Sequence, residues 1–136
     1  MIRNSVVFFP CSDIEKTSQF YQTVCGFPKV QEQKSGKLHI FDTGYGYLGF
    51  CQYDDARPVP SGPVGICISL NCRDKADVDA YYTSFKERGV PIQGAPEYDD
   101  VFPVYSFLIS DPDGYKVEFQ HILLEDQKLT GGRVRA

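Results

Sequence analysis

Apolar and polar residues alternate along several short stretches of the chain, and two other stretches repeat apolar residues at helical spacing. Alternation with period two is typical of strands with one buried face, and recurrence at i, i+3 and i+4 is typical of amphipathic helices. The strand-like stretches are residues 5–9, 27–30, 37–42, 45–53, 64–70, 90–93, 105–110 and 115–122. The pattern therefore predicts eight strands and two helices in a mixed α and β protein.

Both predicted helices have recognisable ends. The first is predicted to begin at the N-cap Ser12, which opens a capping box, and to end before Gly26. The second is predicted to begin after Asp74 or Asp77 and to end before Gly89. Their apolar faces are Ile14, Thr17, Phe20, Tyr21 and Val24 in the first helix, and Val78, Tyr81, Tyr82 and Phe85 in the second. We expect these faces to pack on the outside of a sheet.

The order strand, helix, strand, strand, strand occurs twice along the chain. The two copies begin about 60 residues apart, which is long for a solenoid repeat but suits a duplicated module. We predict a single domain over residues 1–136, with module one at 4–53, a proline-rich linker at 54–63, module two at 64–122 and a tail at 123–136. When the copies are aligned by pattern, Gly49 corresponds to Glu118, and Val6 corresponds to Gly65.

Composition indicates an ordinary soluble protein. The 136 residues carry a net charge of −4 with scattered basic residues, which argues against nucleic acid as a partner. No apolar run reaches the roughly 18 residues of a membrane span, and the start lacks the apolar region of a signal peptide. We therefore expect no membrane partner and a cytoplasmic location. The five cysteines lack regular spacing and mostly lie in apolar runs, as reduced core thiols do.

The stretch 111–119 combines a turn with a strand that carries one carboxylate. Proline and glycine in Asp111-Pro112-Asp113-Gly114 predict a tight turn, because proline presets φ and glycine tolerates a φ that a Cβ would penalise. In the strand that follows, Val117 and Phe119 point to one face while Glu118 points to the other. Glu118 therefore either lies on a wetted sheet face or lines a pocket.

Two motifs resemble those of the vicinal oxygen chelate superfamily, which includes glyoxalase I, bleomycin-resistance proteins and extradiol dioxygenases. SDIEKTSQFY at 12–21, with CGF at 25–27, resembles its opening D-x-x-x-S-x-x-F-Y…G-F motif. DPDGYKVEF at 111–119 is similar to its closing D-P-D-G-x-x-[IV]-E-[LF] motif. The resemblance implies an α+β fold in which two βαβββ modules form a U-shaped sheet around a cavity, and commonly a homodimer.

The resemblance also implies a divalent metal, Ni, Zn, Fe or Mn, held by residues from the first and last strand of each module. The matching positions are Val6, Gly49 (or Cys51, if the register slips by two), Gly65 and Glu118. Only Glu118 carries a donor of the family's kind. The set Cys51, Cys67 and Glu118 is an alternative zinc site, but cysteines in apolar strands usually only pack. We therefore expect neither a metal nor another cofactor.

Without these metal donors, the chain resembles the metal-free branch of the superfamily, exemplified by the bleomycin-resistance proteins, which bind a drug without transforming it. The aromatic content of 14% includes nine tyrosines, which suits a cavity of mixed polarity. We predict that the chain binds or sequesters a small aromatic or cationic compound. The candidate pocket residues are Phe8, Tyr47, Cys67, Ser69, Phe102, Tyr105, Phe107 and Glu118.

Three alternatives for Glu118, the best catalytic candidate, stay open. In the first, Glu118 is a metal ligand in the non-standard site of a glyoxalase- or dioxygenase-like enzyme. In the second, it is the general base of a metal-free enzyme. It has only a structural role if it merely bonds the hydroxyl of a nearby Tyr or Ser. The sequence alone does not decide among these.

Overall fold

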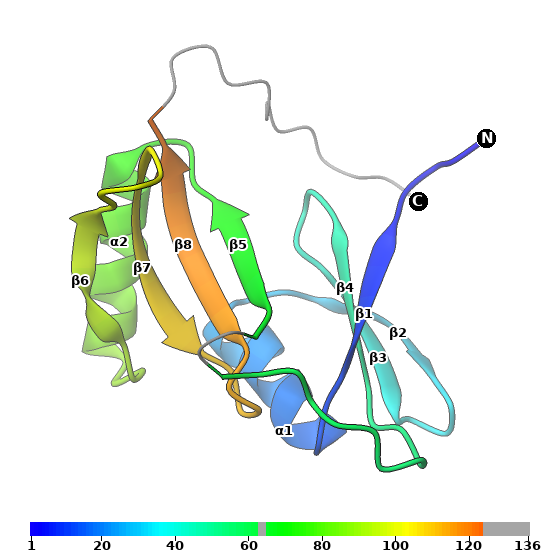
Figure 1. Cartoon of the computed structure of the whole chain (residues 1–136). Helices are drawn as coiled ribbons and strands as arrows, with labels where there is room; N and C mark the ends of the chain where they lie inside the picture. Colours follow the sequence, from blue (N-terminus) through cyan, green and yellow to red (C-terminus); the bar gives the residue numbers. More distant parts are fainter. Residues whose placement is uncertain (63–64, 124–136) are drawn as a thin grey trace. The chain divides into compact units, whose positions relative to one another are not determined.

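The computed structural model describes residues 1–62 and 65–123, which fold as two compact units (Figure 1). The first unit comprises Met1–Pro60, and the second begins at Ser61. Each consists of a four-stranded mixed sheet with a helix packed on one face. The predicted tail at 123–136 lies outside the described residues except for Leu123. No helix among the described residues is long and apolar enough to cross a membrane.

The first unit has the sheet order β1-β4-β3-β2. Its elements are β1 (Val6–Pro10), α1 (Ile14–Gln19), the π-helical turn η1 (Phe20–Val24), β2 (Lys29–Gln33), β3 (Leu38–Asp42) and β4 (Tyr47–Cys51). Strands β1 and β4 are parallel, and the other neighbours are antiparallel.

The second unit repeats this arrangement with the order β5-β8-β7-β6. Its elements are β5 (Cys67–Asn71), α2 (Lys75–Glu87), β6 (Gln93–Tyr98), β7 (Val104–Ser110) and β8 (Lys116–Ile122). Here too the first and last strands pair in parallel, and the others pair antiparallel. The predicted α+β class and the duplicated βαβββ order are thus confirmed.

An aromatic cluster on the helix side of the first sheet forms the core of that unit. Phe50 has no exposed surface, and its ring stacks on Tyr21 at 4.4 Å and on Phe9 at 5.4 Å between centroids. Phe41 packs against both Tyr21 and Phe50. His39 also faces this side, since it pairs with Phe50 across the ladder, and only 1% of its surface is exposed.

The core of the second unit is built in the same way. Phe85 on α2 is buried and makes edge-to-face contacts with Phe107 and Phe119, whose rings stack on each other at 5.4 Å. Val78 is buried on the same helix. The prediction that aromatic helix faces pack on one side of each sheet is therefore confirmed.

Two predicted strands are displaced along the chain. The stretch predicted as strand 90–93 is mostly loop, whereas β6 runs from Gln93 to Tyr98 through residues that were expected to form a loop. Pro96 is tolerated there because β6 is an edge strand, and the ladder is irregular between Gln93 and Glu97. Similarly, β2 begins at Lys29 and includes Gln31, because polar residues suffice for a sheet edge with two exposed sides.

The first helix begins and ends differently from the prediction. Asp13, not Ser12, is the N-cap, and its carboxylate accepts hydrogen bonds from the backbone N–H groups of Glu15 (3.1 Å) and Lys16 (3.3 Å). The α-helix ends at Gln19, and the chain continues as a π-helical turn rather than as regular helix to Val24. The negative charge of the Asp13 carboxylate also opposes the positive end of the helix dipole.

Asp13→Ala is expected to lower the free energy of unfolding by about 1 kcal/mol, the usual value of an N-cap. Ser12→Ala, one residue earlier, is expected to cost less than half as much. Urea unfolding of both variants measures the difference, with the m-value as a check that the transition keeps its character. An equal loss in the two variants would show that Asp13 is not the cap.

The predicted turn before the last strand is present. The carboxylate of the buried Asp111 accepts from the N–H groups of Asp113 (2.9 Å) and Tyr115 (3.0 Å). Gly114 has φ +90°, a conformation that L side chains rarely adopt. These bonds close the turn and set where β8 begins.

Candidate functional site

Glu118 lies on the face of the second sheet that α2 does not cover. Its neighbours Val117 and Phe119 are buried, and Phe119 packs against Phe85 of α2. Because side chains alternate along a strand, Glu118 points to the opposite face, where it is half-buried. The predicted orientation of Glu118 is confirmed.

A hydroxyl and a thiol flank this carboxylate. Ser69 is the ladder partner of Glu118, and its Oγ donates a hydrogen bond of 2.7 Å to Glu118 Oε1. Cys67 Sγ lies 3.6 Å from Ser69 Oγ. Both Cys67 and Ser69 are exposed. The second sheet therefore brings together three of the predicted pocket residues.

The rest of this face is polar. Lys116 pairs with Cys67 in the ladder, and Gln120 donates to Asn71 at 2.8 Å. Partial desolvation of the sulfur raises the pKa of the Cys67 thiol, and the negative charge of Glu118 adds to the rise, while the hydrogen bond with Ser69 opposes it. The thiol is therefore protonated at neutral pH.

Tyr105 and Phe107 lie on the other side of the sheet, which corrects their assignment to one pocket with Glu118. In the β7–β8 ladder Glu118 is opposite Leu108, so Phe107 pairs with Phe119 and faces α2. Tyr105 shares that side and donates a 2.6 Å hydrogen bond to Asp79 of α2. Ser106, a polar residue between Tyr105 and Phe107, is the signal in the sequence that places these aromatics on the opposite face.

The bond to Asp79 raises the pKa of the Tyr105 phenol to about 12. The folded protein thus holds this proton more tightly than the unfolded chain, whose tyrosines titrate near 10. The contribution to stability is present below pH 10 and is lost as pH rises from about 10 to about 12. Absorbance titration near 295 nm is expected to show one late-ionising tyrosine that returns to the ordinary range in Asp79→Asn, and an unchanged titration in that variant would contradict this.

Phe102 occupies the turn between β6 and β7. The carboxylate of Asp99 accepts from the N–H groups of Val101 (2.7 Å) and Phe102 (2.8 Å), and these bonds order the turn. The Phe102 side chain is 65% exposed. It is thus an exposed aromatic residue at a hairpin end, consistent with the predicted loop position.

Phe8 and Tyr47 belong to the first sheet, on the face that α1 does not cover. Phe8 pairs with Gly49, and Val6 pairs with Tyr47, in the parallel β1–β4 ladder. A Cβ built on Gly49 would lie 2.5 Å from Cε1 of the Phe8 ring. The ring therefore rests on the bare backbone of Gly49.

The ladder registers correct the pattern alignment of the two modules. In the first module, Tyr47 lies two residues before Gly49 and pairs with Val6. In the second module, Lys116 lies two residues before Glu118 and pairs with Cys67. The counterpart of Val6 is therefore Cys67, not Gly65, which precedes β5. Pattern matching did not reveal this because the stretch before β5 is itself apolar.

The donors present do not fit the four-residue metal site that the family implies. Within residues 1–62 and 65–123, no group of three or more His, Cys, Asp or Glu is placed to hold an ion. At the position of Gly49 the space is taken by an aromatic ring. Of the alternative zinc set, Cys51 is buried in the first unit, and Cys67 and Glu118 lie on the second sheet, so this set stays a prediction. His39 and His121 lie on the helix sides of their sheets.

Two βαβββ units, each with its first and last strands paired in parallel, define the class of paired-module α+β proteins. The chain belongs to the Glyoxalase/Bleomycin resistance protein/Dioxygenase superfamily, whose family model matches residues 4–119. This confirms the family that the two motifs resemble. No curated protein matches the sequence.

Solved structures support the same fold. A superfamily member from Sphaerobacter thermophilus DSM 20745 is 26% identical, with a TM-score of 0.69 over 89% of this chain and 98% of that one. Lactoylglutathione lyase from Agrobacterium tumefaciens is 24% identical, with a TM-score of 0.68 over 93% and 97%. A glyoxalase/bleomycin resistance protein/dioxygenase from Nocardioides is 15% identical, with a TM-score of 0.73 over 94% and 88%.

Proposed function

We propose that this protein binds a small molecule without a metal, as the bleomycin-resistance branch of its superfamily does. The observation that carries the proposal is the state of the family's ligand positions. Glu118 keeps a carboxylate and is held by Ser69, while Gly49 has no side chain and lies beneath the ring of Phe8. A sheet face with a single carboxylate, held in place by a hydrogen bond, suits the binding of a small molecule better than the coordination of a metal ion.

The carboxylate selects for ligands that carry a cation or a hydrogen-bond donor. An ionised carboxylate has about four acceptor positions, and the Ser69 hydroxyl fills one of them. That bond also limits the rotamers of Glu118, which reduces the entropy lost when a ligand binds. Exposed Cys67 and half-buried Lys116 lie beside it and limit the size and charge of what fits.

The face of the first sheet that α1 does not cover carries apolar side chains of its own. Val6, Phe8 and Tyr47 lie there, and none of them is fully buried. Aromatic side chains contribute much of the binding energy at ligand sites because they combine large area with few rotatable bonds. Taken separately, the first sheet suits an apolar or aromatic group, and Glu118 on the second sheet suits a cation or a hydrogen-bond donor.

A thermal-shift screen of cationic, aromatic and neutral aliphatic compounds tests the proposal. A ligand at 100 times its Kd stabilises the folded state by about 2.7 kcal/mol, which raises the unfolding temperature measurably. We expect hits among aromatic amines and related cations. If no compound in a broad library shifts the transition, the binding function is wrong.

Elemental analysis of the purified protein tests the alternative of an enzyme with a non-standard metal site. Stoichiometric Ni, Zn, Fe or Mn that is lost in Glu118→Ala would overturn the metal-free proposal.

Light scattering after size-exclusion chromatography tests the homodimer that is common in the family and that we include in the proposal. If the protein is a monomer at high concentration, the homodimer is wrong and is dropped from the proposal.

A further inference from the structure

The hairpin end between β6 and β7, residues 98–102, presents apolar side chains from an ordered turn. Val101 and Phe102 are 80% and 65% exposed. The Asp99 carboxylate accepts hydrogen bonds from the N–H groups of both, and the N–H of Asp99 donates to the carbonyl of Val104 at 3.0 Å. Apolar side chains on a turn that is already ordered lose little conformational entropy when another surface covers them.

Tyr98 adds a third large side chain to the hairpin end. It is 55% exposed, and its ring packs on Tyr105 at 5.0 Å between centroids. The ammonium of Lys75 lies 4.7 Å from the centre of the same ring. Single exposed apolar residues are ordinary, but three large ones within five residues are typical of a contact site.

A groove of about 330 Å³ lies at the start of β6, where the strand runs beside α2. It is lined by Tyr82 and Lys86 of α2, Ala95 of β6, and Val90 and Ile92 of the loop between them, together with two glycines. Lys86 is the one charged residue of these seven. The α2–β6 groove therefore offers apolar side chains and a single positive charge.

The hairpin end carries the opposite charge, from Asp99 and Asp100. Within residues 1–62 and 65–123, the Asp100 carboxylate pairs with no cation. The Lys86 ammonium lies 5.8 Å from the centre of the Tyr82 ring and pairs with no carboxylate in the same part of the chain. The two features are therefore complementary in charge as well as in apolar character.

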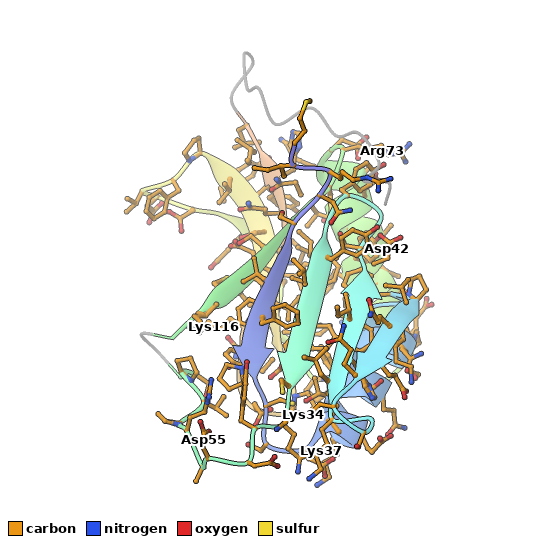
Figure 2. The ribbon with its side chains drawn as sticks, turned by 90° about the vertical axis from the view of Figure 1, so that its right-hand side faces the viewer. Lys34, Lys37, Asp42, Asp55, Arg73 and Lys116 are labelled. Atoms are coloured by element: carbon orange, nitrogen blue, oxygen red, sulfur yellow. The ribbon has the colours of Figure 1, made fainter. Side chains whose placement is uncertain are left out.

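The clustered charges of the first unit differ, because they already neutralise one another. Lys34 and Lys37 lie at one end of the first sheet (Figure 2), and Asp54 contacts them at 2.9 and 4.0 Å. Arg57 pairs with Asp55 in the same way. This cluster needs no partner to balance its charge.

The hairpin end and the α2–β6 groove lie at opposite ends of one edge strand. In the sheet order β5-β8-β7-β6, β6 has a free outer edge. When two copies place these edges side by side about a twofold axis, the end of each β6 lies beside the start of the other. Pro96 lacks an N–H, and the ladder is irregular between Gln93 and Glu97, so backbone pairing across the edge is disfavoured. Contact between the copies therefore depends on side chains.

We infer that the hairpin end of one copy docks into the α2–β6 groove of a second copy, and that the reciprocal contact completes a twofold homodimer. Val101 and Phe102 supply the apolar contact, and Asp100 faces Lys86 of the second copy. This inference rests on the homodimer included in the proposed function and names the surface that forms it.

Charge reversal on either side of the contact tests the inference. Asp100→Lys and Lys86→Glu each place two like-charged pairs in the dimer, one at each symmetric contact. Each is expected to raise the Kd for self-association about tenfold or more, as measured by sedimentation velocity over a range of protein concentrations. Val101→Ser removes the apolar anchor from both contacts and is expected to have a similar effect.

Mixing the two charge variants tests whether the contact is reciprocal. In a heterodimer of Asp100→Lys with Lys86→Glu, one contact keeps the original pair and the other has its charges exchanged. Both contacts then join opposite charges, so an equimolar mixture is expected to associate within about threefold of the wild-type Kd. If each variant is weakened alone but the mixture does not associate, the reciprocal contact is wrong.

Two controls separate this effect from misfolding and from a change in net charge. Glu15→Lys reverses an exposed charge on α1 and is expected to keep the wild-type association. At concentrations below the Kd of the dimer, substitutions at the hairpin end are expected to leave the unfolding temperature unchanged, because these exposed side chains are not part of the core.

The outcomes distinguish this inference from the proposed function. If the wild-type protein is a dimer and Asp100→Lys, Lys86→Glu and Val101→Ser all keep its Kd, the docking surface is wrong and the homodimer stands. If the wild-type protein is a monomer at high concentration, both the docking surface and the homodimer are wrong. Neither result changes the small-molecule binding that the thermal-shift screen tests.

Discussion

Glu118→Gln is expected to weaken the binding of a cationic ligand about tenfold or more, while a neutral ligand of the same shape loses little. A hydrogen bond to a charged group is worth roughly 1.5–3 kcal/mol, and glutamine keeps the shape and an acceptor but not the charge. Benzylamine, protonated at pH 7, and benzyl alcohol are a suitable pair. Their Kd values in wild type and variant, measured by calorimetry, give the contribution of the charge directly.

Two further variants control for this result. Glu87→Gln removes the same charge from the exposed end of α2 and is expected to change neither Kd. Ser69→Ala keeps the carboxylate but removes the 2.7 Å bond that orients it, so we expect a smaller loss, about threefold. Equal losses for benzylamine and benzyl alcohol in Glu118→Gln would mean that the carboxylate does not contact the ligand.

Phe50→Ala is expected to lower the free energy of unfolding by about 3–5 kcal/mol, enough to unfold much of a marginally stable protein. Phe50 is fully buried, and its ring contacts Phe9, Tyr21 and Phe41. Truncation removes the apolar area of a whole ring and leaves a cavity that the rigid β-sheet cannot close. Urea unfolding followed by circular dichroism measures the loss.

The matched control is Phe102→Ala, which deletes the same ring from an exposed turn. Its expected effect on the free energy of unfolding is below about 0.5 kcal/mol, as for most surface substitutions. A loss for Phe50→Ala within the range of the control would mean that the aromatic cluster is not the core of the first unit.

Local sequence rules were sufficient where neighbours along the chain decide the structure. Period-two alternation placed Glu118 opposite Val117 and Phe119, and the proline and glycine of residues 111–114 indicated the turn before it. Asp74 caps α2 as expected, through a bond to the N–H of Asp77. These features depend on residues a few positions apart, which is the range over which propensity and capping act.

Local rules failed where the choice depended on a distant partner. A strand at 93–98 was missed because glycine and proline normally argue against strands, yet the free edge beside β7 accommodates both. Tyr105 and Phe107 were assigned to the wrong face because their aromatic character suits a pocket as well as a core. Only the packing of α2 decides which side of β7 is buried.

By itself the sequence determined the duplicated βαβββ order, the family, and the absence of donor side chains at Val6 and Gly49, because these follow from residue types and their order. The tertiary structure decided what replaces the missing donors. Ser69 lies 49 positions before Glu118 in the chain, and Phe8 belongs to a different strand from Gly49. Such pairs meet only through the register of parallel strands, which is set by the packing of whole faces rather than by local propensity.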